Sequence, residues 1–166
     1  MKIQIKSRFS GAVLFEHEAE NNTITITVEA AVEARANLDG ANLDGANLAR
    51  ANLAGANLDG AYLDGANLAG AYLEDKSVLE GERPVFQIGP IGSRCAYFVA
   101  YITDRGLRLR AGCFFGDVKS FKKKLDRSHG DGIHADEYGA ALALIEKHAE
   151  LWASKVDEAV AEGEKA

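Results

Sequence analysis

The most constraining feature of the sequence is a run of eight consecutive five-residue units between Ala36 and Asp75. The units read ANLDG, ANLDG, ANLAR, ANLAG, ANLDG, AYLDG, ANLAG and AYLED. A period of five matches neither the helical period of about 3.6 residues nor the simple alternation of a strand. The segment therefore folds as a stack of repeated units with an architecture of its own.

The repeat resembles the pentapeptide-repeat family, whose pattern is A-(N/D)-L-x-x, and the pattern persists through all eight units. The resemblance implies a short right-handed quadrilateral β-helix in which the central Leu and the small residue two positions earlier point inward. Four units make one square coil, so about two coils are expected, and the column is only about 10 Å tall at a strand spacing of about 4.8 Å. Both ends of so short a column need a cap, because each exposes Leu side chains and unpaired backbone groups.

Outside the repeat, the chain divides into a cap and a larger module. We expect residues 1–35 to form an N-terminal cap, residues 36–75 the solenoid and residues 76–166 a C-terminal α+β module. Within the cap, the alternation in Lys2–Lys6 and the run Ala12–Glu16 predict a β-hairpin.

Residues 23–34 fit the period of a strand and that of a helix alike, but their Ala- and Glu-rich second half, with Asn22 as N-cap, favours a helix. The C-terminal module is predicted to hold a three-stranded antiparallel sheet plus two helices. The expected elements are strands at Arg83–Ile88, Cys95–Thr103 and Leu107–Gly112, a turn at Gly89–Ser93, a helix that begins at Gly116–Asp117, a last helix over about Asp136–Glu158 with Val156 on its apolar stripe, and a frayed end at Glu162–Ala166.

The net charge of −6 hides an uneven distribution along the chain. Residues 83–130 carry ten Lys/Arg against three Asp/Glu, which gives +7, whereas residues 36–82 and 131–166 each come to −6. A basic segment between two acidic ones indicates either an anionic ligand or contact between segments of the chain itself.

Stacked coils place residues that are twenty positions apart above one another. Asp39 then falls over Asp59 and Asp44 over Asp64, so two adjacent faces of the solenoid are acidic. Carboxylates about 4.8 Å apart repel each other, so these faces are expected to stay in water or to meet basic groups. A third face, of small neutral residues, is better suited to packing against another subunit.

The turn Gly89–Arg94 combines glycine amides, a hydroxyl and a guanidinium, which are groups that bind phosphate or carboxylate. It links two strands and does not open a helix, so it lacks the context of a phosphate-binding fingerprint, and a plain β-turn is the simpler interpretation. For a ligand site in the basic module we select the turn hydroxyl, a cationic wall and two stacking tyrosines: Ser93, Arg94, Tyr97, Tyr101, Arg108, Arg110 and Lys122.

Cys95, Cys113, His129 and His134 match the ligand number of a tetrahedral zinc site, but no CxxC pair is present, so we expect no metal and no cofactor. Buried thiols and surface histidines are the simpler interpretation. Cys113 and His129 are also candidates for a nucleophile and its base, yet no third orienting group is identifiable. We therefore expect no enzyme activity.

The layout of nearly the whole chain is also similar to pentapeptide-repeat proteins of bacteriophages and prophages. The similarity is carried by Arg8–Val13, Ile88–Arg94, Gly112–Gly116 and Tyr138. It implies a phage or bacterial origin but no settled activity.

Three functions stay open on this basis. The first is a non-enzymatic binding protein, as a homo-oligomer, whose basic module engages a host protein or a nucleotide-like small molecule to counter a bacterial defence. The second is a DNA-mimicking inhibitor of a topoisomerase or other DNA-binding protein, as in the quinolone-resistance members of the family, although a column of about 10 Å spans only about three base pairs. The third is a structural or oligomerisation protein.

The sequence also favours a location and disfavours one class of partner. It has neither a long apolar run nor a signal-peptide-like region, which predicts a cytoplasmic location in a bacterial host cell and no membrane partner. The acidic segments would repel phosphate, so we do not expect nucleic-acid binding.

Overall fold

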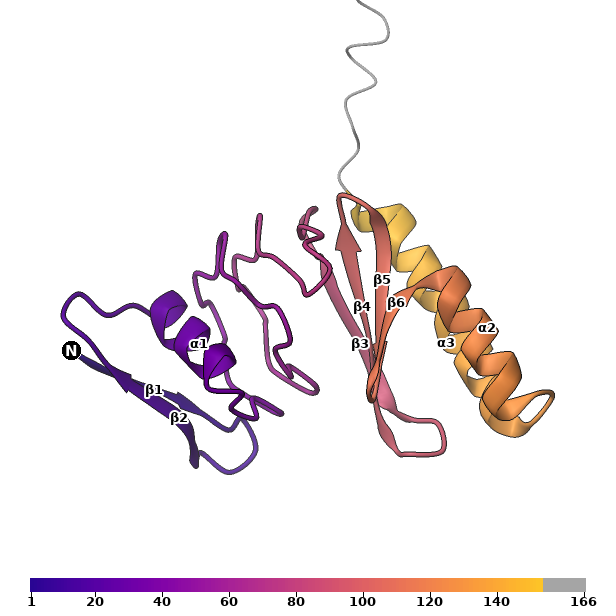
Figure 1. The fold of residues 1–166 in the computed structure, drawn as a ribbon, viewed down its shortest axis with the longest axis horizontal. Helices are drawn as coiled ribbons and strands as arrows, with labels where there is room; N and C mark the ends of the chain where they lie inside the picture. The colour runs from indigo at the N-terminus through magenta and orange to yellow at the C-terminus, as the bar shows by residue number, and fades with distance from the viewer. Residues whose placement is uncertain (154–166) are drawn as a thin grey trace, which may run out of the picture.

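The computed structural model describes residues 1–153. Three parts follow one another along the long axis of the molecule, namely a hairpin with one helix, a stack of coils, and a sheet covered by two helices (Figure 1). The expected continuation of the last helix to Glu158, Val156 on its stripe, and the frayed end at Glu162–Ala166 lie outside the described residues.

The N-terminal part is the predicted hairpin and helix. Strands β1 (Lys2–Lys6) and β2 (Val13–Glu18) pair antiparallel, and helix α1 (Ile24–Glu33) follows. The N-cap is Thr23, whose hydroxyl accepts a hydrogen bond from Ile26 N at 3.2 Å, so the prediction of Asn22 as cap was wrong by one residue.

Asn22 is buried beneath the helix and has a different structural role. Its amide nitrogen donates to His17 O at 2.9 Å, and its amide oxygen accepts from the Thr27 hydroxyl at 3.2 Å. These bonds tie the loop to α1. The helix in turn contacts the first coil, where Thr25 donates to Asn47 O at 2.6 Å.

The repeat stacks with a period of twenty residues. Four isolated parallel bridges recur in steps of five residues: Asn37 with Asn57, Asn42 with Tyr62, Asn47 with Asn67, and Asn52 with Tyr72. Seven of the eight repeat leucines are buried between the coils, and Leu63 is half-buried. The second residue of each unit points outward, and an Asn there accepts from the backbone N–H two positions on, as Asn42 does from Asp44 N at 3.2 Å.

The two coils are covered at both ends by the chain itself. Below the first coil, Asn42 N donates to Lys6 O at 2.8 Å and Arg8 N donates to Gly40 O at 2.8 Å. Above the second coil, Leu79 N donates to Ala71 O at 2.9 Å. These pairs continue the coil-to-coil hydrogen bonding into the caps.

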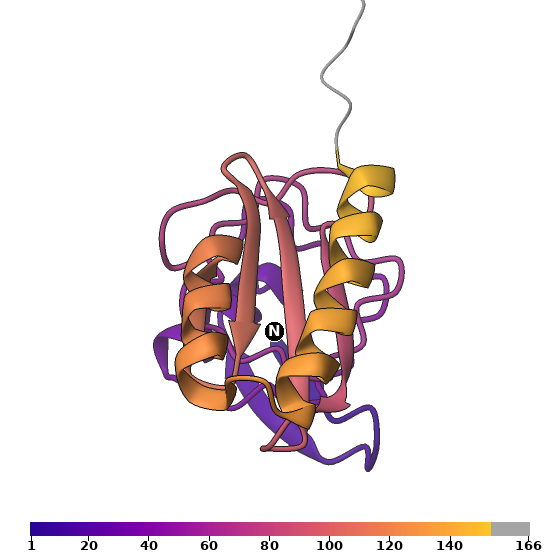
Figure 2. The same cartoon turned by 90° about the vertical axis from the view of Figure 1, so that its right-hand side faces the viewer.

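The C-terminal part is a four-stranded antiparallel sheet in the order β3-β4-β5-β6, with two helices on one face (Figure 2). The prediction of three strands was wrong, because Phe114–Asp117 forms a fourth strand that is short and follows directly on a glycine turn. The elements are β3 (Val85–Ile91), β4 (Ala96–Thr103), β5 (Gly106–Ala111), β6 (Phe114–Asp117), α2 (Val118–His129) and α3 (Ile133–Trp152). None of the described helices is both long and apolar enough to cross a membrane.

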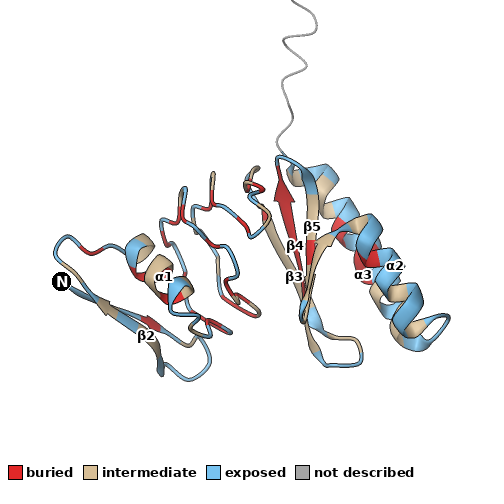
Figure 3. Cartoon of the chain, viewed as in Figure 1, coloured by how far each residue is buried: buried red, intermediate tan, exposed pale blue. Residues whose placement is uncertain are grey.

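The two faces of β4 contribute to two separate cores. Val99 and Tyr101 point toward the solenoid and pack with its leucines. Phe98 and Ala100 point the other way and pack with Phe121 and other residues of the two helices. The central strand is therefore buried on both sides, which Figure 3 shows as an almost continuous red arrow.

Candidate functional site

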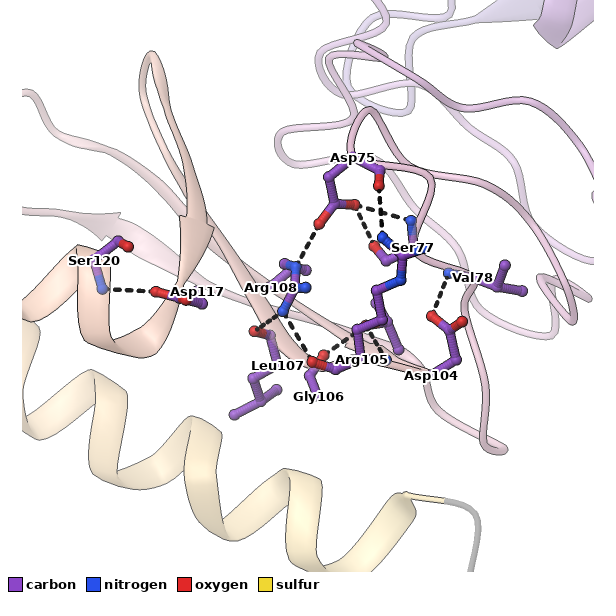
Figure 4. A network of polar contacts seen from close by, with 11 residues as sticks. Asp75, Ser77, Val78, Asp104, Arg105, Gly106, Leu107, Arg108, Asp117 and Ser120 are labelled. Atoms are coloured by element: carbon purple, nitrogen blue, oxygen red, sulfur yellow. Dashed lines mark hydrogen bonds and ion pairs between the residues drawn. The ribbon is translucent and has the colours of Figure 1, made fainter.

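The arginines of β5 contact the solenoid. Arg108 Nε lies 2.6 Å from Asp75 Oδ2, and Arg110 Nη2 lies 2.5 Å from Glu74 Oε2. Because Leu107 and Leu109 alternate with them, both arginines point to the face opposite the helices. Figure 4 shows Arg108 with Asp75 and the neighbouring backbone groups. Two members of the predicted cationic wall are therefore used to join the sheet to the last repeat.

Asp75 is held in its charged form at this junction. Burial opposes ionisation, but hydrogen bonds from the Arg108 guanidinium and from Ser77 outweigh it and lower the pKa of Asp75 to about 2. The Ser77 hydroxyl donates to the same carboxylate at 2.5 Å. The segment that leaves the repeat is thereby fixed before β3 begins.

Asp59 lies at the same face of the sheet, but its pKa shifts in the opposite direction from that of Asp75. Burial raises the pKa of its carboxyl, Arg110 lowers it, and stacking over Asp39 raises it further. Among the described residues, neither Asp59 Oδ1 nor Arg110 Nε has a hydrogen-bond partner, although both atoms are buried. One of the two predicted acidic faces is thus partly covered by the basic module, while Asp44 and Asp64 on the other face are exposed.

The two tyrosines selected as a stacking surface also face the solenoid. Tyr101 is 2% exposed, and burial raises its pKa. Tyr97 lies against Gly60 of the second coil. Neither ring is open to a ligand in the way that the sequence predicted. Lys122 points outward from α2, 3.5 Å from Glu146, so the seven selected residues do not form one site.

Ser93 and Arg94 do line a pocket of about 260 Å³ at the turn end of the sheet. The β3–β4 turn forms one wall, the β5–β6 turn the second, and the C-terminal half of α2 with the start of α3 the third. The lining residues are Ser93, Arg94, Ala96, Ala111, Gly112, Cys113, Phe114, Phe121, Lys124, Leu125, Ser128, His129 and Tyr138.

The chemistry of this pocket is cationic at its rim and aromatic in its interior. Within the described residues, neither Arg94 nor Lys124 has a carboxylate within ion-pair distance, and Lys124 Nζ lies 5.5 Å from the centroid of the Phe114 ring. Tyr138 packs edge-on against Phe98, with ring centroids 5.3 Å apart. Positive charge without an internal counter-ion, beside aromatic rings, is suited to an anion that carries a flat apolar group.

The β3–β4 turn that presents Arg94 is anchored on α3. Gly92 N donates to the Glu137 carboxylate at 2.7 Å, and Gly92 O accepts from Cys95 N at 3.1 Å. The strand β3 runs on to Ile91 through a register shift after Ile88, so the turn lies three residues later than predicted. Burial and the nearby Glu137 raise the pKa of Tyr138, and Arg94 opposes that shift.

Sequence reasoning missed Lys124, Ser128, His129, Phe114 and Tyr138 as pocket residues. A signal for part of this set exists, since Phe121, Lys124, Leu125 and Ser128 recur at helical spacing and lie on one face of α2. Lys124 and Ser128 lie at the edge of the apolar stripe formed by Phe121 and Leu125, a position at which helical spacing alone does not separate a pocket residue from a solvated one.

The cysteines and histidines considered as metal ligands differ in burial from what the sequence predicted. Both Cys95 and Cys113 are exposed, so the expectation of buried thiols was wrong. His129 and His134 are half-buried, with ring centroids 5.6 Å apart. Within the described residues, no group of three or more His, Cys, Asp or Glu side chains is placed to hold a metal ion.

The chain thus consists of a stacked five-residue repeat between an N-terminal cap and an α+β module. Residues 34–75 match the family model for pentapeptide repeats in eight copies, so this segment is a run of pentapeptide repeats. Proteins with such repeats are generally non-enzymatic structural or binding proteins. A search of the curated proteins and a search of the solved structures each returned no match for the chain.

Proposed function

We propose that the chain is a non-enzymatic binding protein whose C-terminal module takes a small anionic ligand with a flat ring, such as a nucleotide, in the pocket between its two turns and α2. The observation that carries the proposal is the pairing of Arg94 and Lys124, which have no acidic partner among the described residues, with the rings of Phe114 and Tyr138. A guanidinium and an ammonium bind phosphate, and aromatic rings stack on a base.

The size of the pocket limits the ligand. A volume of about 260 Å³ suits a mononucleotide or a ligand of similar size better than an oligonucleotide. The hydroxyls of Ser93 and Ser128 supply additional donors beside the two cations. The electrostatic gain depends on the ligand being an anion, because no carboxylate lines the pocket.

The biological setting extends this proposal. The repeat would form a right-handed quadrilateral β-helix of about two coils that, with the N-terminal cap, carries the module as a scaffold. The resemblance to phage and prophage proteins supports a protein that acts in the cytoplasm of a bacterial host, as a homo-oligomer, and counters a defence system by sequestering a nucleotide-like signal or by engaging a host protein.

The DNA-mimic alternative receives less support. It needs both acidic faces, and Asp59 lies half-buried beside Arg110, where its negative charge is in part neutralised. Only Asp39, Asp44 and Asp64 of the four carboxylates stay exposed. A purely structural role would use the face of small neutral residues for contact with another subunit. Helix α1 already contacts that side of the coils, where Thr25 donates to Asn47 O.

Isothermal titration of the full chain with nucleoside monophosphates, triphosphates, the free nucleoside and inorganic phosphate tests the proposal. We expect binding of at least one nucleotide, weakened about tenfold or more by Arg94→Ala or Lys124→Ala, since each removes a charge-assisted hydrogen bond. Lys123→Ala is the matched control, because Lys123 is exposed on the same helix and does not line the pocket.

Equal loss of affinity in the Lys123→Ala control would place the ligand on the outer face of α2 instead. Absence of heat with every nucleotide, together with absence of a partner in a pull-down from bacterial lysate, would remove the support for this function.

A further inference from the structure

A second groove lies between the solenoid and the sheet, away from the pocket of the module. Its volume is about 920 Å³. One wall is formed by residues 61–69 of the second coil, and the other by residues 81–87 together with His148. Strand β3, which enters this wall, is an outer strand of the sheet.

On the side that corresponds to this groove, the upper edge of the first coil is hydrogen-bonded to the second coil. Gly45 N donates to Asp64 O at 2.8 Å, and Leu48 N donates to Asn67 O at 2.8 Å. Between them, Ala46 O accepts from Asn67 N at 2.9 Å. This edge of the coil therefore presents donor, acceptor and donor to a segment that runs parallel above it and turns at Gly65, whose φ is 63°.

The same three groups recur on the second coil, twenty residues later, as Gly65 N, Ala66 O and Leu68 N. Among residues 1–153, no backbone or side-chain group makes a hydrogen bond to any of them. The residues that carry them line the groove. An unpaired edge of a β structure is a template for another strand.

Other parts of the second coil are already covered. The side chain of Gln87 accepts from Gly60 N at 2.8 Å and donates to Ala61 O at 3.1 Å. Farther along, Gly70 N donates to Leu79 O and Leu73 N donates to Ser77 O. The chain thus replaces a third coil at these positions and leaves open, among residues 1–153, the edge around residues 63–68, where Leu63 N also lacks the bond that Leu43 N makes to Tyr62 O.

The charge at this edge indicates which type of side chain a bound segment would place there. Asp44 and Asp64 belong to coils joined by the Asn42–Tyr62 bridge, and both are exposed. Two stacked carboxylates about 4.8 Å apart repel each other and favour a cation at the next level. Ala66 is half-buried at the wall of the groove and leaves room for one small side chain, whereas Leu68 is already 4% exposed and needs no further cover.

We propose that the edge of the second coil at residues 65–68 binds a peptide segment of a partner protein, which adds as a third rung by β-augmentation. The segment places Lys or Arg over Asp64, a glycine over Gly65, where the chain turns with a positive φ, and a small residue over Ala66, that is, the order [K/R]-G-A. Main-chain hydrogen bonds give the affinity and these side chains give the choice of sequence. The site does not depend on a ligand in the module pocket.

Amide hydrogen exchange of the full chain, with and without a peptide, tests this proposal. The probe is a synthetic peptide that copies residues 61–70 with Asp64→Lys. In the free protein, the amides of Gly65 and Leu68 are expected to exchange about tenfold or more faster than those of Gly45 and Leu48, which are hydrogen-bonded. The peptide is expected to slow Gly65 and Leu68 selectively.

Two controls separate pairing from non-specific adhesion. The same peptide N-methylated at the position equivalent to Asn67 loses the donor for Ala66 O and is expected to bind at least about tenfold more weakly. The protein variant Asp64→Lys, at an exposed site, is expected to reverse the preference, so that the unaltered copy of residues 61–70 binds better than the Lys peptide.

The proposal is overturned if Gly65 and Leu68 are already as protected as Gly45 and Leu48 in the free protein. Protection that is independent of concentration would assign the edge to residues 154–166 of the same chain, and protection that grows with concentration would assign it to a second copy. It is equally overturned if the Lys peptide at millimolar concentration leaves both amides unchanged.

Discussion

Asp75 illustrates how single carboxylates set the strength of the junction between repeat and sheet. Its pKa of about 2 lies below the usual value of 3.8 because Arg108 and Ser77 donate to the charged form. The stabilisation is therefore complete above about pH 4 and is lost as the pH falls through the folded-state pKa. Since the side chain is a third exposed, solvent screening reduces the contribution to about 1 kcal/mol.

We expect Asp75→Asn to lower the free energy of unfolding by about 1 kcal/mol at pH 7 and to lose that effect near pH 2. Urea unfolding at pH 7, 4 and 2 measures it. Asp44→Asn, on the exposed face, is the control and is expected to change stability by less than about 0.5 kcal/mol. A pH-independent loss in Asp75→Asn would assign the effect to packing instead.

For Asp59, the expected pH dependence of stability has the opposite sign. Burial raises its pKa, and its Oδ1 has no hydrogen-bond partner among the described residues. Folding is then favoured by the protonated form, so its stability contribution is fully present below pH 3.8 and declines as the pH rises through the folded-state pKa. We expect Asp59→Asn to stabilise the protein by about 0.5–1 kcal/mol at pH 7 and to be neutral at pH 3, as followed by thermal unfolding at both pH values. Destabilisation at pH 7 would mean that attraction to Arg110 outweighs burial.

At the scale of elements, the β3–β4 turn holds one wall of the candidate pocket through close contact with α3. Gly92 has a positive φ of 71°, and a Cβ there would collide with the ring of Tyr138. We expect Gly92→Ala to lower the free energy of unfolding by about 1–3 kcal/mol and to weaken ligand binding, because the turn and Tyr138 must separate.

The matched control for the turn is Gly139→Ala in α3. Apart from the backbone of the helix itself, no atom lies within 4 Å of the added Cβ, and the helix gains propensity, so a stabilisation of about 0.5–1 kcal/mol is expected. Thermal unfolding of both variants gives the comparison. A Gly92→Ala variant as stable as the parent would show that Tyr138 moves aside without cost.

Elements with strong periodicity were predictable from the sequence, and those defined by contacts between distant segments were not. The twenty-residue stacking follows from the five-residue pattern, and the hairpin and α1 follow from alternation and composition. Strand β6 has only four residues, and its pairing with Arg108–Ala111 decides its structure. The late turn after β3 depends likewise on a register shift that no local signal specifies.

The candidate site was predicted only in part for the same reason. Ser93 and Arg94 were found because glycine, hydroxyl and guanidinium stand together in sequence. Alternation places Arg108 and Arg110 on one face of β5, but only the tertiary structure shows that this face meets Glu74 and Asp75. Grouping them with Arg94 therefore combined residues from opposite sides of the sheet.

At the scale of the whole molecule, the solenoid and the module share a core. Val99 and Tyr101 of β4 belong to the same buried cluster as the repeat leucines, and Phe98 and Ala100 link that strand to the helices. The last coil thus gains in the sheet the apolar cover that a third coil would supply. A change inside the repeat should consequently be felt in α3, at the far side of the sheet.

Leu58→Ala tests this coupling. Leu58 is 2% exposed, so its truncation leaves a cavity and is expected to lower the free energy of unfolding by about 2–5 kcal/mol. Trp152, the single tryptophan, lies at the end of α3 under the Arg83 guanidinium and reports on the module by fluorescence. If solenoid and module unfold as one unit, the urea midpoint from Trp152 shifts together with that from exchange of the solenoid amides.

Leu144→Ala serves as the control, because the same atoms are removed from a side chain that is 54% exposed on α3, and a change below about 0.5 kcal/mol is expected. A Trp152 midpoint that stays at its original value in Leu58→Ala, while the solenoid amides lose protection, would contradict the shared core. The two parts would then unfold independently, and neither the contact through Val99 and Tyr101 nor the ion pairs of Asp75 and Glu74 would couple them.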